Sequence, residues 1–209
     1  MEKQKIYLIV YALTLSIATL ISSCKIQQQK QMDLEYGLLR FLHHDPASII
    51  RQNTIDNNDT LYGRFLRYDY LRENIRSTNN PNDSEPFLNL DLLFTEDQKG
   101  QLINKFKELM EVQLDPDRMI AEVLPEEIYL ERKENFDKIY PKNLSEPIVP
   151  RMNKISFPII QKGINGVIYA ITFDTFSFRF RSDSVGEIRV FVKSDPYWEL
   201  LGFAPCDIQ

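Results

Sequence analysis

One segment near the C-terminus decides the fold: residues 163–203, which read GINGVIYAITFDTFSFRFRSDSVGEIRVFVKSDPYWELLGF. Asn165-Gly166 is a strong signal for a tight turn between antiparallel strands. Phenylalanines alternate with polar residues from position 176 to 181, and a period of two is typical of a β-strand. The segment therefore predicts consecutive strands joined by short turns, which form an antiparallel meander.

The meander has about four strands in this prediction, and Trp198 is the expected anchor of its core. The first predicted strand opens with Ile155-Ser156-Phe157, and the others are Val167–Arg181, Ile188–Lys193 and Tyr197–Phe203, with turns at Lys162–Gly166, Ser182–Gly186 and Ser194–Pro196.

Helical spacing of apolar residues precedes the strands. Thr95 and Gln98 form a capping-box signature at the start of one helix, and Asp59 is a candidate N-cap of another. Helices before strands predict an α+β fold, with N-terminal helices packed on the C-terminal meander. The predicted helices are Asp33–His44 (ended by Pro46), Asp59–Arg76, one after Thr95 with Leu102, Ile103, Phe106, Leu109 and Met110 on its apolar face, and one opened by Pro125 with Ile128, Arg132, Phe136 and Ile139.

The N-terminus has the composition of an export signal. Lys3 and Lys5 give a basic head, and the apolar run Ile6–Leu20 is shorter than the ~20 residues that span a bilayer. The following residues, Ile21-Ser22-Ser23-Cys24, resemble the lipobox of bacterial lipoproteins. That resemblance implies diacylglycerol transfer to the Cys24 thiol, cleavage between Ser23 and Cys24, and N-acylation of the new amine. The expected organisation is a signal peptide over 1–23, a lipidated flexible tether over 24–32 and one α+β domain over 33–209.

The residues directly after Cys24 indicate in which membrane the lipoprotein would be found. Lys25 occupies the position where an aspartate favours retention at the inner membrane in many Gram-negative lipoproteins. Surface-exported lipoproteins of the Bacteroidetes group resemble one another in acidic residues directly after the cysteine, and here the first acid is Asp33. The expected location is the periplasmic face of the outer membrane, with the cell surface as the alternative.

The C-terminal strands also resemble lipoproteins of the Bacteroidetes group. The residues that carry this resemblance are a strand with Pro158, then Gly166–Ile171, Gly186–Lys193 and Tyr197–Leu201. The resemblance extends over about 55 residues and implies no particular activity.

The net charge and the cysteine content restrict the kinds of partner and of covalent link that we expect. Removal of residues 1–23, which carry a net charge of +1, changes the net charge of the chain from −5 to −6. This mild acidity argues against a nucleic-acid partner. With Cys24 lipidated, Cys206 is the only remaining cysteine, and it is expected to be a small buried apolar residue rather than a reactive thiol.

Motifs for metal or nucleophilic chemistry are absent from the sequence. His43 and His44 are neighbours, whereas metal-binding histidines on a helix are three or four residues apart, so this pair is expected to mark a helix end. No serine stands in a Gly-x-Ser-x-Gly elbow. Asp56 could begin a calcium loop, but its sixth position is Leu61, where glycine is needed. The acid pairs Asp115/Asp117 and Glu126/Glu127 are expected at helix starts, and no cofactor or metal is expected.

Two weaker patterns remain. The bases Arg179, Arg181, Arg189 and Lys193 could form a strip that receives an acidic partner, or they could be the solvated face of the sheet. Asp59-Thr60-Leu61 and Asp183-Ser184-Val185 resemble the short O-glycosylation sites of exported Bacteroidetes proteins, with Thr60 and Ser184 as the acceptors.

These patterns favour a membrane-anchored envelope lipoprotein that acts as a non-enzymatic binding or structural module. Its partners would be the lipid bilayer, through acylated Cys24, and an envelope protein. A periplasmic immunity or inhibitor protein is one alternative, and a hydrolase without a recognisable motif is another.

Overall fold

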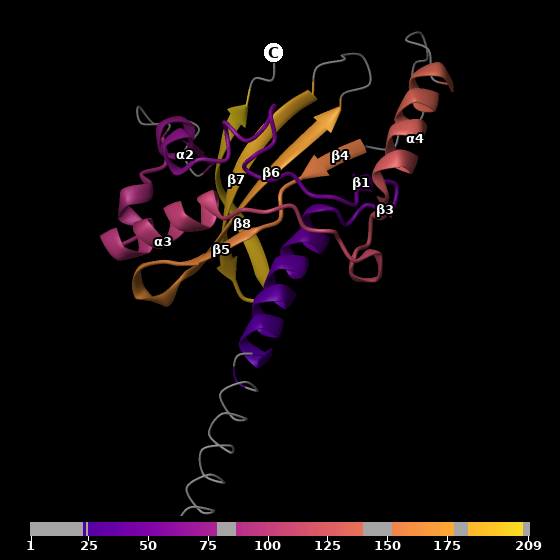
Figure 1. Ribbon diagram of the computed structural model, residues 1–209. Coiled ribbons are helices and arrows are strands. Elements are labelled where there is room, and N and C mark those ends of the chain that lie inside the picture. Colours follow the sequence, from indigo (N-terminus) through magenta and orange to yellow (C-terminus); the bar gives the residue numbers. More distant parts are fainter. Residues whose placement is uncertain (1–22, 24, 79–86, 140–151, 178–183, 207–209) are drawn as a thin grey trace, which may run out of the picture.

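The computed structural model describes residues 23, 25–78, 87–139, 152–177 and 184–206 (Figure 1). An unlabelled N-terminal helix occupies residues 25–42. The other helices are α2 (Tyr68–Asn74), α3 (Glu96–Lys107) and α4 (Glu126–Ile139), with short 3₁₀ turns η1 (Leu90–Leu92), η2 (Pro116–Arg118) and η3 (Ile164–Gly166). The strands are β1 (Ile49–Arg51), β2 (Arg76–Ser77), β3 (Glu122–Leu124), β4 (Met152–Ile155), β5 (Ile159–Lys162), β6 (Ile168–Ser177), β7 (Ser184–Ser194) and β8 (Tyr197–Cys206).

The predicted meander forms the centre of a larger sheet. Strands β5, β6, β7 and β8 pair antiparallel in chain order. Beyond them the described strands continue in the order β2-β8-β7-β6-β4-β1-β3, and β1 runs parallel to both β3 and β4. The α+β class is confirmed, but the predicted number of about four strands was too small, because the sheet is mixed and has eight strands among the described residues. Strands β1 and β3 have three residues each, too few to show a period of two.

Helices cover both faces of this sheet. Leu71 of α2 and Leu102 and Phe106 of α3 pack against one face, where Phe173 of β6 belongs to the same cluster. On the opposite face, Leu38 of the N-terminal helix packs against Ala170, Phe191 and Trp198. Figure 1 shows this helix crossing the sheet obliquely and projecting beyond it at its N-terminal end. The burial of Trp198, 6% exposed, confirms the predicted anchor.

The N-terminal helix begins earlier than the sequence indicated. Residues 25–32, expected to be a flexible tether, are helical with exposed side chains. Side-chain hydrogen bonds at helical spacing support this part, from Gln29 to Asp33 and from Gln31 to Glu35, each 3.0 Å long. Residue 25, directly after the predicted lipidation position Cys24, thus already belongs to a helix that is continuous with the domain.

The second predicted helix was too long. Only Tyr68–Asn74 of the predicted range Asp59–Arg76 is α-helical, and residues 57–67 form a series of turns and bends. Asp59 does cap a turn, since its carboxylate accepts hydrogen bonds from the backbone N–H groups of Leu61 and Tyr62. At Gly63 a Cβ would lie 2.2 Å from the carbonyl oxygen of Asn57, so this tight path excludes any side chain. Packing of the backbone has overridden the helical periodicity.

The remaining local signals were mostly correct. Thr95 and Gln98 form the predicted capping box at the start of α3, although Met110 lies beyond this helix and is 73% exposed. Asn165 and Gly166 both have positive φ, 58° and 77°, as the predicted turn requires. The predicted turn Ser182–Gly186 was wrong at its end, because β7 already begins at Ser184, opposite Ser177 of β6. Residues 178–183 lie outside the described part.

Docking of the N-terminal helix gives a stability prediction. Leu38 is fully buried between the helix and the sheet, whereas Met32 on the same helix is 45% exposed. We expect Leu38→Ala to lower the free energy of unfolding by about 2 to 5 kcal/mol, because it leaves a cavity. Met32→Ala should change it by less than about 0.5 kcal/mol. Denaturant unfolding measures both values, and equal effects would contradict this docking.

Candidate functional site

A groove lies between the N-terminal helix and the β7–β8 hairpin. Trp198, the single tryptophan of the chain, forms its base with its indole packed near Leu38 and Phe191. The groove has a volume of about 540 Å³ and is lined mainly by apolar surface. We call it the hairpin groove. The residues that line it are Lys30, Asp33, Leu34, Gly37 and Phe41 from the helix and Lys193, Pro196, Tyr197 and Trp198 from the hairpin.

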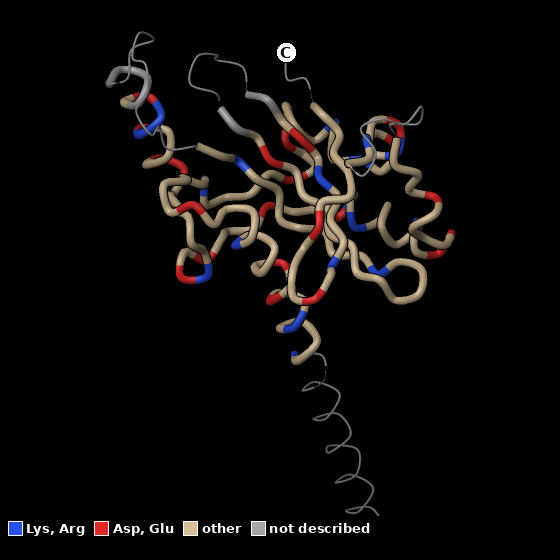
Figure 2. Tube along the Cα trace, turned by 180° about the vertical axis from the view of Figure 1, so that it is seen from behind, with Lys and Arg blue, Asp and Glu red and all other residues tan. Residues whose placement is uncertain are grey.

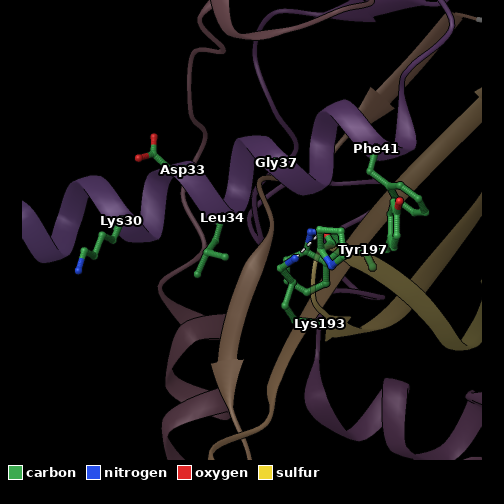
Figure 3. Close-up of a pocket in the computed structure, with 9 residues that line it drawn as sticks. Lys30, Asp33, Leu34, Gly37, Phe41, Lys193 and Tyr197 are labelled. Atoms are coloured by element: carbon green, nitrogen blue, oxygen red, sulfur yellow. Dashed lines mark hydrogen bonds between the residues drawn. The ribbon is translucent and has the colours of Figure 1, made fainter.

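Figure 3 shows how these side chains lie. Leu34 and Phe41 project from the helix on the side of the hairpin, whereas the carboxylate of Asp33 points the other way. Phe41 is 43% exposed and Tyr197 is 69% exposed, so both aromatic rings present apolar surface to the solvent. A Cβ built on Gly37 meets no atom within 4 Å, which leaves the middle of the groove open on the helix side.

Lys193, near the tip of the β7–β8 hairpin, contacts several groups of the protein itself. The Lys193 ammonium lies 3.0 Å from the carboxylate of Asp195 and donates a 2.8 Å hydrogen bond to the carbonyl of Pro196. It also lies 5.6 Å from the centre of the Trp198 ring, within the range of a cation–π contact. These contacts hold the turn of the hairpin and place the Lys193 ammonium beside a carboxylate at the edge of the groove.

A second group of polar residues lies beyond the C-terminal end of the same helix. His43 Nε2 is 3.5 Å from one carboxylate oxygen of Asp174, and the other oxygen accepts a 3.1 Å hydrogen bond from Arg189. Arg189 also pairs with Glu187 at 3.0 Å. Register explains this meeting, because Asp174 of β6 faces Glu187 of β7 directly, and Arg189 is two residues along on the same face.

This His43–Asp174–Arg189 cluster has the residue types of an acid-oriented base, which the sequence did not reveal. The sequence places Asp174 far from His43, and the fold brings its carboxylate to 3.5 Å from the ring, although neither of these two facing atoms makes a hydrogen bond. The side chains of His43 and Asp174 are only 6% and 4% exposed. A general base must reach the proton that it abstracts. The burial of this pair therefore favours a structural role, in which the cluster joins the helix end to the sheet.

Two further polar contacts involve Lys105 of α3, which bonds to β5, and Glu35 of the N-terminal helix. The Lys105 ammonium donates a 2.6 Å hydrogen bond to the carbonyl of Ile160, and Glu35 accepts one from Gln31. Burial raises the pKa of Glu35 above its ordinary 4.5, although the Gln31 hydrogen bond and the nearby cations Lys105 and Arg118 oppose this shift. Burial also lowers the pKa of Lys105.

The predicted modification sites are separated in space from the groove and the cluster. Thr60 is exposed in the turn that Asp59 caps, as an O-glycosylation acceptor needs. Ser184 is the first residue of β7 instead of a turn residue. Cys206 is fully buried, as expected for a small apolar residue, and Ser23 is exposed. Cys24 lies outside the described residues.

The acidic motifs have structural roles, and Glu126 of α4 also pairs with Arg51 of β1 at 3.2 Å. Asp115 caps η2 by accepting a hydrogen bond from the backbone of Asp117, and Glu126 and Glu127 stand in the first turn of α4, as predicted. The Asp56 carboxylate accepts from the backbone of Asn58, which makes a polar turn.

The predicted basic strip is divided between described and undescribed residues. Arg179 and Arg181 lie outside the described part, whereas Arg189 and Lys193 are both engaged with carboxylates. Figure 2 shows acidic and basic positions interspersed along the described elements. Over that same part of the chain, no group of three metal-binding side chains occurs and no helix is long and apolar enough to cross a membrane.

Comparison of the chain with protein-family models, curated proteins and solved structures finds no match.

The two adjacent histidines provide a matched test of the buried cluster. We expect His43→Ala to lower the free energy of unfolding by about 1 to 3 kcal/mol, because it removes a buried partner of Asp174. His44→Ala should have an effect under about 0.5 kcal/mol, since this side chain is exposed. Chemical denaturation measures both. Equal stability of the two variants would contradict the structural role of His43.

Glu35 gives a prediction for the pH dependence of stability. Its pKa is higher in the folded protein than the 4.5 of an unfolded chain, so the folded state binds the proton more tightly. This contribution is fully present below pH 4.5 and is lost as the pH rises through the folded-state pKa. Glu35→Gln removes the loss, so its Tm should increase relative to wild type as the pH rises from about 4 to 7. An equal Tm difference between wild type and Glu35→Gln at about pH 4 and about pH 7 would contradict the raised pKa of Glu35.

Proposed function

We propose that this protein is a bacterial envelope lipoprotein, anchored to the periplasmic face of the outer membrane through acylated Cys24. In this proposal residues 1–23 are removed on export, and the remaining chain acts as a non-enzymatic binding or structural module. The observation that carries the proposal is the sequence Ile21-Ser22-Ser23-Cys24, placed directly after an apolar run of signal-peptide length.

The arrangement after Cys24 supports this proposal. The helix of residues 25–42 extends away from the sheet with exposed side chains over its first eight residues, then packs onto the sheet through Leu38 and Leu39. A lipid on Cys24 would thus be connected to the domain by a helix instead of a loose tether. Each residue of a helix adds about 1.5 Å, so this projecting part would set the sheet roughly 12 Å from the anchor.

The hairpin groove supports a binding role at the membrane-proximal side. Phe41, Tyr197 and Trp198 place aromatic, apolar surface along one face of the helix whose N-terminal end follows Cys24. Mainly apolar concave sites with a few polar groups are the usual form of ligand sites. The described His43–Asp174 pair is buried, and this supports the non-enzymatic role.

The test of the anchor is substitution of its acceptor. We expect Cys24→Ala to remain unprocessed and to take up no fatty-acid probe in a Gram-negative host, because the thiol is the proposed acyl acceptor. Wild type should be labelled, processed and recovered with the outer membrane. Cys206→Ala is the matched control, since it removes the other cysteine and should leave labelling unchanged. Normal labelling of Cys24→Ala would refute the proposal.

A further inference from the structure

The two ends of the hairpin groove differ in chemistry. Its helix wall is a row of residues at spacings of three and four, which lie on one face of the helix: Lys30, Leu34, Gly37 and Phe41. Figure 3 shows Lys30 at one end of this row and Phe41 at the other. The Phe41 ring also contacts the buried ring of Phe191, with 6.4 Å between the ring centres. The groove therefore has a cationic end and an aromatic end.

The cationic end lacks a counter-charge. The Lys30 side chain is exposed, and within the described part of the chain no carboxylate contacts its ammonium. The carboxylate of Asp33 points away from the groove and pairs with Arg118 at 2.7 Å. Lys193, the other cation that lines the groove, pairs with Asp195. One positive charge is thus left uncompensated, and it favours an anionic group over a neutral or cationic one at this end.

The distance between the two ends suits one acyl chain. Phe41 follows Lys30 by eleven positions, and eleven residues of helix rise roughly 16 Å. The hydrocarbon core of a bilayer is about 30 Å thick and holds two opposed layers of chains, so one acyl chain extends about 15 Å. Midway along this path, a Cβ built on Gly37 meets no atom within 4 Å, which leaves room for the chain. The volume of about 540 Å³ lies within the range of sites for one small molecule.

We propose that the hairpin groove binds a free long-chain fatty acid, with its carboxylate at Lys30 and its chain laid along Leu34 and Gly37 to Phe41. The proposal deepens the binding role proposed above and does not depend on the lipid anchor. Removal of the chain from water supplies most of the affinity. The exposed ion pair with Lys30 adds only a few-fold, but it selects the carboxylate end of the ligand.

Quenching of Trp198, the single tryptophan of the chain and a residue of the groove, tests this proposal. The wild-type protein in phosphatidylcholine vesicles is titrated with a long-chain fatty acid brominated along its chain, and with the alcohol and the amine of the same length and bromination. Bromine quenches a tryptophan only on close contact. At equal free concentration in water, the carboxylate should reach half-quenching at about threefold lower concentration than the alcohol, and the amine should be weakest. Equal values for the three ligands would overturn the proposal.

Two lysines of the N-terminal helix supply matched variants for the head group. Lys30→Gln should abolish the preference for the carboxylate over the alcohol, because it removes the uncompensated charge. Lys25→Gln should keep this preference, since Lys25 is also exposed but does not line the groove. An unchanged preference in Lys30→Gln, or the same loss in Lys25→Gln, would overturn the assignment of the carboxylate to Lys30.

Two helical glycines supply matched variants for the chain. A Cβ at Gly37 or at Gly100 of α3 meets no atom within 4 Å, so leucine can replace either without a clash. Gly37→Leu fills the groove and should raise the half-quenching concentration about tenfold, whereas Gly100→Leu should leave it unchanged. Equal values for the two variants would overturn the proposal.

A bilayer lipid is the other source of an acyl chain, and brominated phosphatidylcholine in the vesicles distinguishes it. Without added fatty acid, these vesicles should leave the emission of Trp198 unquenched. Quenching as strong as that by the free fatty acid would overturn the proposal, because the groove would then face the bilayer. Failure of fatty-acid binding leaves acylation of Cys24 unaffected, whereas a wild-type protein without an acyl label refutes the anchor, so the two failures are distinguishable.

Discussion

The packing of the N-terminal helix on the sheet is the contact on which the rest of the structure depends. Strands β6, β7 and β8 place apolar side chains on both faces, and α2 and α3 can cover only one of them. Ala170, Phe191 and Trp198 on the other face are removed from water by Leu38 of the N-terminal helix. Because each buried Å² of apolar surface contributes about 25 cal/mol, the domain requires this helix as a structural layer.

This layer also determines where polar groups meet. Along its length the N-terminal helix forms one wall of the hairpin groove, and the β7–β8 hairpin forms the other. Beyond its C-terminal end, His43 lies near Asp174, which pairs with Arg189. Loss of one partner from such a buried ionic group is far more destabilising than the pair is stabilising. The helix is therefore held at two places, by apolar packing in its middle and by the buried cluster at its end, and the residues that project beyond the sheet lead toward Cys24.

The sequence predicted correctly those turns and helix caps that depend only on residues close together in the chain. The turn at Asn165-Gly166 needs positive φ and the cap at Thr95 needs a side-chain acceptor, so both could be recognised from residue types alone. Strands β1 and β3 could not, because three-residue strands carry no periodicity and gain their pairing from residues far along the chain. The helix predicted from Asp59 was too long for a similar reason, since close backbone packing at Gly63 outweighs apolar spacing.

The candidate sites were harder to predict than the fold, because each joins distant segments. His43 meets Asp174, and Leu34 lies beside the hairpin groove with Trp198, only after the helix has docked. By contrast, the proposed lipobox is contiguous, so it could be recognised from the sequence alone, and it leads to the central proposal that a lipid-bearing Cys24 directly precedes an integral helix of the domain. The intact mass of the protein purified from membranes tests this claim most directly. We expect a chain that begins at Cys24 and carries the added mass of its acyl groups. A chain that still begins at Met1, or that begins at an unmodified Cys24, would contradict it.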